Sequence, residues 1–362
     1  MDEKTVKIGI VGIGRGVAIG LALLGIREEV NARIIAICDL NQERIDSCKK
    51  QWAKEGFTEY EVYYSYEEML AKADINAVVV SIGLPTHVEH SIMALRAGKH
   101  VISEIPAFAT LEEAKLLKAE VLAHPELKYM VAENCCYWAF IETWKRMRED
   151  GKFGQIVYAE GEYLHSGDPD KFKPASTETW RGKMHGINYL THELGPLLYI
   201  MDDRCVSVSC LEPDVKYNPY RKTPAAGVAI FKTAKGAVIR IFICFGAYTG
   251  YDHNFALYGT RGSILTDNTK SIEDAHSYAK LYEVPGTMQA ALEIPVGMAY
   301  PGETLEGHGG AEPKMMREFV ECILNDVQPK LNIDKAIQMS LPGILAQESA
   351  AQGGAAVEIP EL

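Results

Sequence analysis

The sequence predicts an α/β N-terminal domain with a doubly wound parallel sheet and an α+β C-terminal domain with a large, mainly antiparallel open sheet. Short apolar, β-branched runs alternate with helical segments as far as residue 134. Strand-like runs then follow one another with hairpin signals between them. A chain of 362 residues that is 47% hydrophobic is also long enough for two domains. We therefore expect one domain over residues 1–134 and a second over residues 135–362.

The first domain is expected to alternate strands with helices. Five apolar runs predict strands at residues 6–14, 32–40, 75–83, 99–106 and 127–134. The segments between them predict helices at residues 17–26, 42–56, 66–73, 90–98 and 111–123. Thr110 supplies an N-cap for the last helix, and Gly98 ends the helix before it. Such alternation implies right-handed crossovers and a mostly parallel sheet.

The second domain is expected to consist mainly of consecutive strands. A helix at residues 140–154 leads into strands at residues 156–165, 206–213, 225–246 and 254–267. The pairs Lys235-Gly236 and Arg261-Gly262 stand where hairpin turns belong. Helices at residues 315–326 and 334–350 close the chain. A wide antiparallel sheet usually leaves one face for a partner, so we expect a homo-oligomer.

Charge and hydropathy exclude several classes of partner. The formal net charge is -12, and nucleic acids or anionic membranes would require clustered lysine and arginine. The N-terminus has no basic region followed by an apolar run and a cleavage site. No apolar run reaches the roughly 20 residues that a membrane span needs. We expect a cytoplasmic protein with no nucleic-acid or membrane partner.

The eight cysteines form no C-x-x-C pair and no repeated ligand spacing. The adjacent Cys135 and Cys136 point in different directions in either a helix or a strand, so they would rarely share a metal or bond to each other. We interpret the cysteines as buried, inert thiols and predict no metal. A metal site formed by Glu104, His165 and His192 stays open as an alternative, although their spacing does not demand one.

A glycine-rich loop at residues 12–20 follows the first predicted strand and opens a helix. In that context glycines let backbone amides approach a pyrophosphate at a helix N-terminus. The third glycine of G-x-G-x-x-G would fall at Val17, so the loop is a variant. Asp39 ends the second strand, where a carboxylate accepts hydrogen bonds from ribose hydroxyls and repels a 2′-phosphate. The sequence thus predicts a Rossmann-type domain that binds NAD rather than NADP; a plain tight turn is the alternative. The candidate contacts are Gly12, Gly14, Arg15, Gly16 and Asp39.

The run GLPTHVEHSIMALRAGKHVISEIPA, residues 83–107, resembles the signature of the Gfo/Idh/MocA oxidoreductases. Pro85, His90 and Glu104 match positions of that signature, and the resemblance implies cofactor contacts for them. In sugar and inositol dehydrogenases of the family, a lysine follows the glutamate and helps the hydroxyl proton leave. Here Ile105 takes its place.

The stretch ENCCYWAFIETWKRMREDGKFGQIVYAEGEYLH, together with NYLTHELGP and GHGG, is similar to glycoside hydrolase family 109 of the same superfamily. That branch also lacks the lysine. The chain also resembles gut bacterial enzymes that oxidise the 3-hydroxyl of glucosides, including C-glucosides. The resemblance covers nearly the whole chain and implies a small sugar or glycoside as substrate.

The resemblance and the residue chemistry together suggest the site. Removing a hydride from a carbinol carbon requires a nearby group that takes the hydroxyl proton, and His192 is the first candidate. Asn188 stands where the family has an aspartate one helical turn before the histidine. The candidate catalytic residues are His192, Tyr189, Lys183 and His185. The candidate substrate contacts are Glu133, Tyr137, Tyr163, His165, Asn188 and His308. Asn134, Trp180 and Arg181 complete the candidate cofactor contacts.

Several of these residues also have structural interpretations. A lone histidine on a partly apolar helix is usually structural, which would hold for His192 without the resemblance. Tyr163 and Tyr189 could be half-buried aromatics, Trp180 could be core, and His308 could belong to a loop over the sugar or to a simple turn.

Three functions fit these observations. The leading one is NAD-dependent oxidation of the C3 hydroxyl of a glycoside to a 3-keto sugar. The second is a redox-assisted glycosidase of the family 109 type, in which oxidation, elimination, hydration and reduction recycle NAD. The third is a non-catalytic NAD-binding regulator, suggested by Ile105 and Asn188 in place of the family's lysine and aspartate.

Overall fold

The computed structural model describes residues 5–166, 178–217, 219–247, 252–266, 278–283, 292–293 and 306–362. The chain divides into two compact units. Unit 1 contains Met1–Asn134 and Glu303–Ile337, and unit 2 contains Cys135–Gly302 and Gln338–Leu362.

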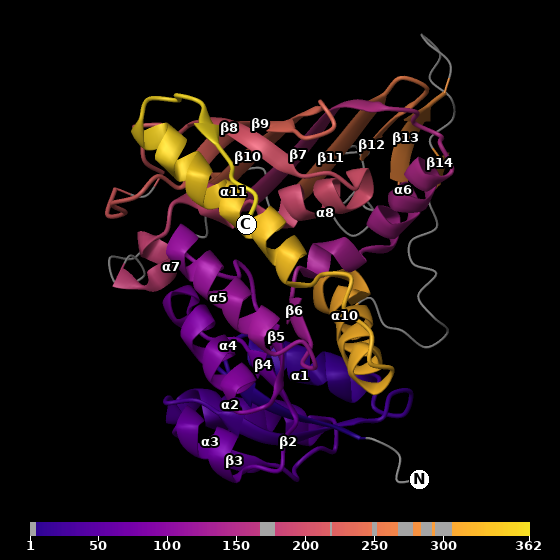
Figure 1. Ribbon diagram of the computed structural model, residues 1–362. Helices are drawn as coiled ribbons and strands as arrows, with labels where there is room; N and C mark the ends of the chain where they lie inside the picture. Colours follow the sequence, from indigo (N-terminus) through magenta and orange to yellow (C-terminus); the bar gives the residue numbers. More distant parts are fainter. Residues whose placement is uncertain are drawn as a thin grey trace. The chain divides into compact units, whose positions relative to one another are not determined.

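Unit 1 contains the expected alternation of strands and helices (Figure 1). Its strands are β1 (Val6–Val11), β2 (Ala32–Cys38), β3 (Glu61–Tyr63), β4 (Ala77–Val80), β5 (His100–Ser103) and β6 (Tyr129–Val131). Its helices are α1 (Gly16–Gly25), α2 (Gln42–Lys54), α3 (Tyr66–Lys72), α4 (His87–Arg96), α5 (Leu111–Ala123) and α10 (Glu306–Leu324). β4 is buried throughout and β1 is buried except at Lys7, which is typical of central strands covered on both faces.

The six strands of unit 1 form one sheet in the order β3-β2-β1-β4-β5-β6, and every neighbouring pair is parallel. The chain starts at the centre of the sheet and then builds outward in both directions. The order reverses between β1 and β4, and in such sheets ligands bind beyond the carboxyl ends of the strands at that point. This confirms the predicted doubly wound sheet.

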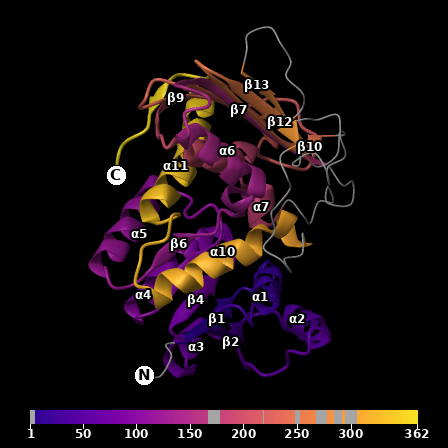
Figure 2. The same cartoon turned by 90° about the vertical axis from the view of Figure 1, so that its right-hand side faces the viewer.

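One segment departs from the predicted division at residues 1–134 and 135–362. Residues 303–337, which include α10, belong to unit 1 although they lie near the C-terminus. Figure 2 shows α10, in orange, beside α1, and Arg317 on α10 forms an ion pair with Glu29. The helix buries Met315, Met316 and Phe319, so its apolar face completes the core of the first unit.

Unit 2 is built on a nine-stranded sheet in the order β14-β13-β12-β11-β7-β10-β9-β8-β15. The neighbours β7 and β10 are parallel, and all other neighbouring pairs are antiparallel. The strands are β7 (Ile156–Ser166), β8 (Cys205–Leu211), β9 (Ala226–Thr233), β10 (Val238–Ala247), β11 (Asp252–Gly259), β12 (Ser263–Thr266), β13 (Tyr278–Tyr282), β14 (Leu292–Glu293) and β15 (Val357–Glu358). The predicted α+β class, with a large and mainly antiparallel sheet, is confirmed.

Helices cover one face of this sheet. They are α6 (Ala139–Glu149), α8 (Thr191–Met201) and α11 (Ile333–Ala351), which Figure 1 draws on the same side; the first residues of α11 still belong to unit 1. Gly161 on β7 is required there, because a Cβ at this position would lie 2.7 Å from Cβ of Glu193 on α8. The opposite face is more exposed, as the alternating burial of β9 shows.

Among the described residues, no helix combines the length and the apolar content needed to cross a membrane. The eight cysteines are all buried and free. Burial raises the pKa of the Cys38, Cys48 and Cys210 thiols to about 12 and that of Cys322 to about 11. Such thiols are not reactive nucleophiles at neutral pH.

Candidate active site

The loop between β1 and α1 lies very close to the backbone of Ser81, the residue that follows β4. Gly12 has a φ of +90°, and a Cβ there would lie 2.4 Å from the carbonyl oxygen of Ser81. Its N–H donates to the carbonyl oxygen of Cys38 at 2.8 Å. Both the left-handed conformation and the close approach require glycine at this position.

Gly16 explains why the loop departs from the regular G-x-G-x-x-G pattern. A Cβ at Gly16 would lie 2.7 Å from Cγ2 of Ile10 and 2.9 Å from Oγ of Ser81. This glycine therefore allows close packing of α1 on β1, which is the part usually played by the third glycine. At Gly14, in contrast, the nearest such atom to a Cβ would be Nη1 of Arg44 at 3.9 Å. The loop therefore leaves room at Gly14 for a pyrophosphate.

Asp39 follows β2 and is bound to the backbone on both sides. Its Oδ2 accepts the N–H of Ile13 and its Oδ1 accepts the N–H of Asn41, both at 2.8 Å. These bonds hold the carboxylate beside the glycine loop. A carboxylate has about four acceptor positions, so Asp39 can also accept hydrogen bonds from ribose hydroxyls. The glycine loop and this carboxylate fit NAD.

Arg15 is held between two glutamates of unit 1. Its Nε lies 3.3 Å from Oε1 of Glu104, and its Nη2 binds Glu312 of α10. Glu312 is 1% exposed, and the side-chain amide of Asn134 donates to it at 3.5 Å. The structure thus brings together three predicted cofactor contacts, Arg15, Glu104 and Asn134. It adds Glu312, which lies nearly 300 positions from Arg15 and has no motif that could have indicated it.

The 83–107 segment has mainly structural contacts in unit 1. Pro85 lies in a 3-10 turn, Leu84–Thr86, that leads into α4. The His90 ring stacks on Tyr66 with centroids 4.8 Å apart, and its Nδ1 lies 3.0 Å from the Thr86 carbonyl oxygen. Ile105, at the position of the family's lysine, is 5% exposed. These contacts show how the segment is held, and the cofactor contacts of Pro85 and His90 stay predictions.

Unit 2 gathers the predicted tyrosines and histidines into one ring cluster. Tyr163 on β7 and His192 on α8 meet edge to face, with centroids 5.7 Å apart. Tyr189 lies 5.1 Å from His192, also edge to face, and stacks on Tyr163 at 6.1 Å. His165 lies 5.9 Å from Tyr163. Tyr163, Tyr189 and His192 are all buried, so the cluster is an environment of low dielectric.

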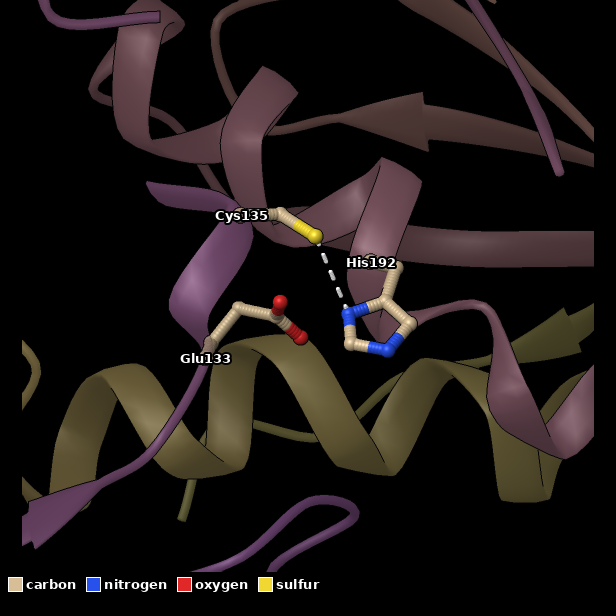
Figure 3. A group of neighbouring side chains, drawn as sticks. All are labelled: Glu133, Cys135 and His192. Atoms are coloured by element: carbon tan, nitrogen blue, oxygen red, sulfur yellow. Dashed lines mark hydrogen bonds between the residues drawn. The ribbon is translucent and has the colours of Figure 1, made fainter. Parts of the chain in front are cut away.

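Cys135 contacts His192, the first candidate for the proton acceptor. Its Sγ lies 3.2 Å from Nδ1 of His192, and Figure 3 draws the two side chains with Glu133, which precedes Cys135 by two residues. Cys135 is a buried thiol, as predicted, and its sulfur lies against the imidazole. A proton transfer to His192 would use its other nitrogen, Nε2.

Five more predicted residues of unit 2 have partners of their own. Lys183 is exposed and forms an ion pair with Glu178 at 3.4 Å. His185 binds Glu212, with Nδ1 2.8 Å from Oε2. Asn188 donates from its side-chain amide to the carbonyl oxygen of Gly343 at 3.3 Å. Arg181 lies 4.6 Å over the Trp180 ring and 5.6 Å over that of Tyr189, so this pair borders the cluster.

The local helix differs from the expected one. Asn188 and Tyr189 lie in a 3-10 turn, Gly186–Tyr189, and α8 begins only at Thr191. The predicted spacing of one helical turn between Asn188 and His192 is therefore wrong, and the Asn188 amide binds the α11 backbone. A Cβ at Gly186 would lie 2.6 Å from the Ala225 carbonyl oxygen, so close packing on the chain before β9 shapes this turn.

The remaining candidates lie in different elements. Glu133 is fully buried just after β6 in unit 1, and Tyr137 is buried at the end of the 3-10 turn Asn134–Tyr137. His308 lies in the first turn of α10, in unit 1. The predicted loop or turn at His308 is wrong because the helix begins at Glu306. The alternative metal site would use Glu104, which already pairs with Arg15.

Sequence reasoning missed several members of the ring cluster. His253 on β11 stacks on Tyr163 with centroids 4.5 Å apart and rings 17° from parallel. Phe245 on β10 packs against the Tyr163 ring edge to face at 5.5 Å. In the sheet, His253 is the direct partner of Tyr163, and Phe245 that of His165. The signal that could have found them is strand register, which a single sequence does not reveal.

Two family models match the chain. Residues 6–132 match the Gfo/Idh/MocA model described as "Oxidoreductase family, NAD-binding Rossmann fold". Residues 145–359 match the companion model described as "Oxidoreductase family, C-terminal alpha/beta domain".

Curated relatives include several glycosyl hydrolase family 109 proteins. The one from Solibacter usitatus is 26% identical, and the match covers 99% of this chain and 88% of the relative. A family 109 protein of Bacteroides thetaiotaomicron is 24% identical, with 99% and 85% covered.

Solved structures with the same fold include two sugar-related dehydrogenases. A levoglucosan dehydrogenase in complex with NADH has a TM-score of 0.85 at 20% identity, covering 99% of this chain and 100% of that one. The scyllo-inositol dehydrogenase from Lactobacillus casei with NAD(H) and scyllo-inositol has a TM-score of 0.78 at 19% identity, covering 98% and 99%.

Proposed function

Because this chain belongs to the Gfo/Idh/MocA family of NAD-binding oxidoreductases, we propose that it oxidises the C3 hydroxyl of a glycoside to a 3-keto sugar. The substrate class is an O- or C-glucoside. NAD, when bound, accepts the hydride that leaves the carbinol carbon. The observation that carries the proposal is the buried cluster of Tyr163, Tyr189 and His192 in unit 2.

The chain's own residues perform the proton transfer in this proposal. His192 takes the hydroxyl proton at Nε2, while Cys135 holds the imidazole through Nδ1. Tyr189 and Tyr163 donate hydrogen bonds from their phenol hydroxyls to neighbouring sugar oxygens. Ile105 has no proton to exchange, so these residues replace the family's lysine.

Unit 1 binds and selects the cofactor. The open position at Gly14 and the α1 N-terminus accept the pyrophosphate, and Asp39 binds the ribose hydroxyls. Arg15 is neutralised by Glu104 and Glu312, which makes it a weak partner for a 2′-phosphate. Both features favour NAD over NADP.

A second function is favoured by the curated relatives. The family 109 proteins match across 99% of this chain, so a redox-assisted glycosidase is the other candidate. It begins with the same oxidation, which acidifies the C2 proton and allows elimination at C1. Water addition and return of the hydride follow, and NAD is recycled. The same proton-transfer residues would serve both reactions.

Product analysis separates the two candidates. The purified protein, with and without added NAD, is mixed with a panel of O- and C-glucosides and N-acetylgalactosaminides. The products are followed by mass spectrometry and NADH by absorbance. A product lighter by two hydrogens with the glycosidic bond intact, together with NADH, would support net oxidation.

Free sugar and aglycone without accumulated NADH would instead support the glycosidase. The matched 3-deoxy glucoside is the control, because it has no C3 hydroxyl and should give neither product. If the 3-deoxy compound reacts as well as its parent, C3 is not the position of oxidation.

A further inference from the structure

A buried carboxylate and a buried imidazole lie directly behind the ring cluster of unit 2. Glu193 on α8 is fully buried, and His253 on β11 is 1% exposed. Oε1 of Glu193 lies 2.6 Å from Nδ1 of His253. Neither residue belongs to the proton-transfer group proposed above.

The imidazole of His253 connects this pair to the cluster. Its face lies against the ring of Tyr163, with centroids 4.5 Å apart and an interplanar angle of 17°. Its centroid lies 6.0 Å from that of His192, edge to face. Trp138 meets the His253 ring edge to face at 4.9 Å. The ring plane of His253 is therefore tightly constrained, and Tyr163 stacks on that plane.

The backbone is shaped to admit the carboxylate at this point. Gly161 lies on β7 two residues before Tyr163, and a Cβ there would lie 2.7 Å from Cβ of Glu193. Glu193 also follows His192 directly in α8. The first turn of α8 thus carries both His192 of the cluster and the Glu193 carboxylate behind it.

A contribution to the stability of the fold does not by itself explain why Glu193 and His253 are buried as a pair. Replacing a buried ionic pair by apolar residues of similar volume is often neutral or stabilising. In contrast, a carboxylate that accepts the Nδ1–H of a histidine fixes its tautomer and ring orientation, as the outer partners of metal-bound histidines do. The position of the pair against Tyr163 favours this second role.

We infer that Glu193 and His253 are positioning residues for Tyr163. Glu193 accepts the Nδ1–H of His253 and fixes the plane of the imidazole. The imidazole face then fixes the Tyr163 ring, and with it the direction in which the phenol hydroxyl meets the substrate. This inference rests on the proposed function for the role of Tyr163.

Two substitutions at position 193 test the role of the hydrogen bond. Glu193→Gln keeps an oxygen that can accept from Nδ1–H, and Glu193→Leu fills the same space without an acceptor. We expect kcat of the Leu variant to fall by roughly 10-fold or more, with the Gln variant within about 3-fold of the parent. The KM for NAD should be unchanged in both, because the glycine loop and Asp39, which bind the cofactor in the proposed function, belong to unit 1.

A double-mutant cycle tests whether the effect passes through Tyr163. In a Tyr163→Phe background the phenol hydroxyl is already absent, so Glu193→Leu should lower kcat by less than about 2-fold further. An equal loss in both backgrounds would overturn the inference, since Glu193 would then act elsewhere. Unchanged kcat of Glu193→Leu in the parent protein would overturn it as well.

A readout independent of activity separates this inference from the proposed function. ¹⁵N-histidine NMR of the whole protein should show His253 protonated at Nδ1, and Glu193→Leu should abolish that preference. A parent protein with His253 protonated only at Nε2 would refute the positioning role even if glycosides are oxidised. If no glycoside is oxidised but the Nδ1–H signal depends on Glu193, the proposed substrate fails and the positioning pair stands.

Discussion

At the scale of single residues, the neighbours of His192 fix the position of its imidazole. The residue is 8% exposed, its Nδ1 lies 3.2 Å from Sγ of Cys135, and the rings of Tyr163 and Tyr189 meet its ring edge to face. These contacts restrain the imidazole in one orientation. A proton acceptor gains most when it is held in this way before the substrate arrives.

Replacing His192 by alanine should therefore affect turnover and leave cofactor binding intact. We expect kcat to fall by a factor on the order of 100 or more, which is what a general base typically contributes. Steady-state kinetics with a glucoside substrate and a fluorescence titration with NADH would measure the two effects. His124→Ala is the control, because that histidine caps the C-terminus of α5 in unit 1 and pairs with Glu120. Unchanged turnover in His192→Ala would remove this residue from the mechanism.

Asp39 offers a prediction for cofactor choice. Asp39→Ala should weaken NAD binding, on the order of 10-fold, and relax the discrimination against NADP. The alanine also leaves the N–H groups of Ile13 and Asn41 without their acceptor. Asp39→Asn keeps an acceptor and removes the charge, so it should relax the discrimination with a smaller loss of NAD affinity. Calorimetric titration of each variant with NAD and with NADP measures the two affinities. If both affinities are unchanged, Asp39 does not bind the ribose.

At the scale of elements, a hydrogen bond between the starts of β5 and β6 depends on the protonation state of a histidine. His100 begins β5, and its Nδ1 accepts the N–H of Lys128, just before β6, at 2.9 Å. Burial and, to a smaller extent, the nearby Lys128 ammonium lower the pKa of His100 to about 4, while Asp326 and Glu126 oppose the shift. A protonated Nδ1 could no longer accept this hydrogen bond.

The free energy of unfolding should therefore depend on pH through His100. Between pH 6.5 and about 4 the unfolded chain binds a proton at this residue that the folded chain does not. Stability from this group is complete above pH 6.5 and is lost as the pH falls toward about 4. Urea unfolding at several pH values should show that the free energy of unfolding depends less on pH in His100→Gln than in the parent. The glutamine amide oxygen can still accept the N–H of Lys128 but does not titrate. Identical pH dependence in parent and variant would contradict the assignment.

At the scale of the whole molecule, the exposed face of the nine-stranded sheet is the expected subunit interface. Strand pairing places Leu211, Val228, Ile230 and Val238 on this face, and each is at least 37% exposed. Arg240 binds Glu160 at 3.0 Å and Glu162 at 2.7 Å on the same face. An exposed patch of apolar side chains is typical of surfaces that meet another copy.

Ile230→Glu should reduce the molecular mass in solution toward that of one chain. The introduced carboxylate would meet its own symmetry mate and Glu160 or Glu162 across a desolvated interface. Light scattering after size exclusion gives the mass, and circular dichroism checks the fold. Val327→Glu is the matched control, because Val327 is also 51% exposed but lies in unit 1. A parent and an Ile230→Glu variant of equal mass would exclude this face as the interface.

Local sequence pattern was enough to predict a large part of the fold and of the cofactor site. The alternation up to residue 134 predicts the parallel sheet because each apolar run must be covered by the helix that follows it. The glycines at 12, 14 and 16 and Asp39 predict NAD because strand, loop and helix are consecutive in the chain. The resemblance added Tyr163, Tyr189 and His192, which the structure brings together. These features depend on short sequence separations or on motifs.

Tertiary structure decided the rest, because the contacts join distant segments. Residues 303–337 complete unit 1, and Glu312 reaches Arg15 across nearly 300 positions. His253 lies opposite Tyr163 only through the register of β11 against β7, and Cys135 reaches His192 over 57 positions. A single sequence carries periodicity and local propensity, which determine elements. The register of strands and the packing of helices depend on the free energy of the whole fold, so the partners of the site emerge only there.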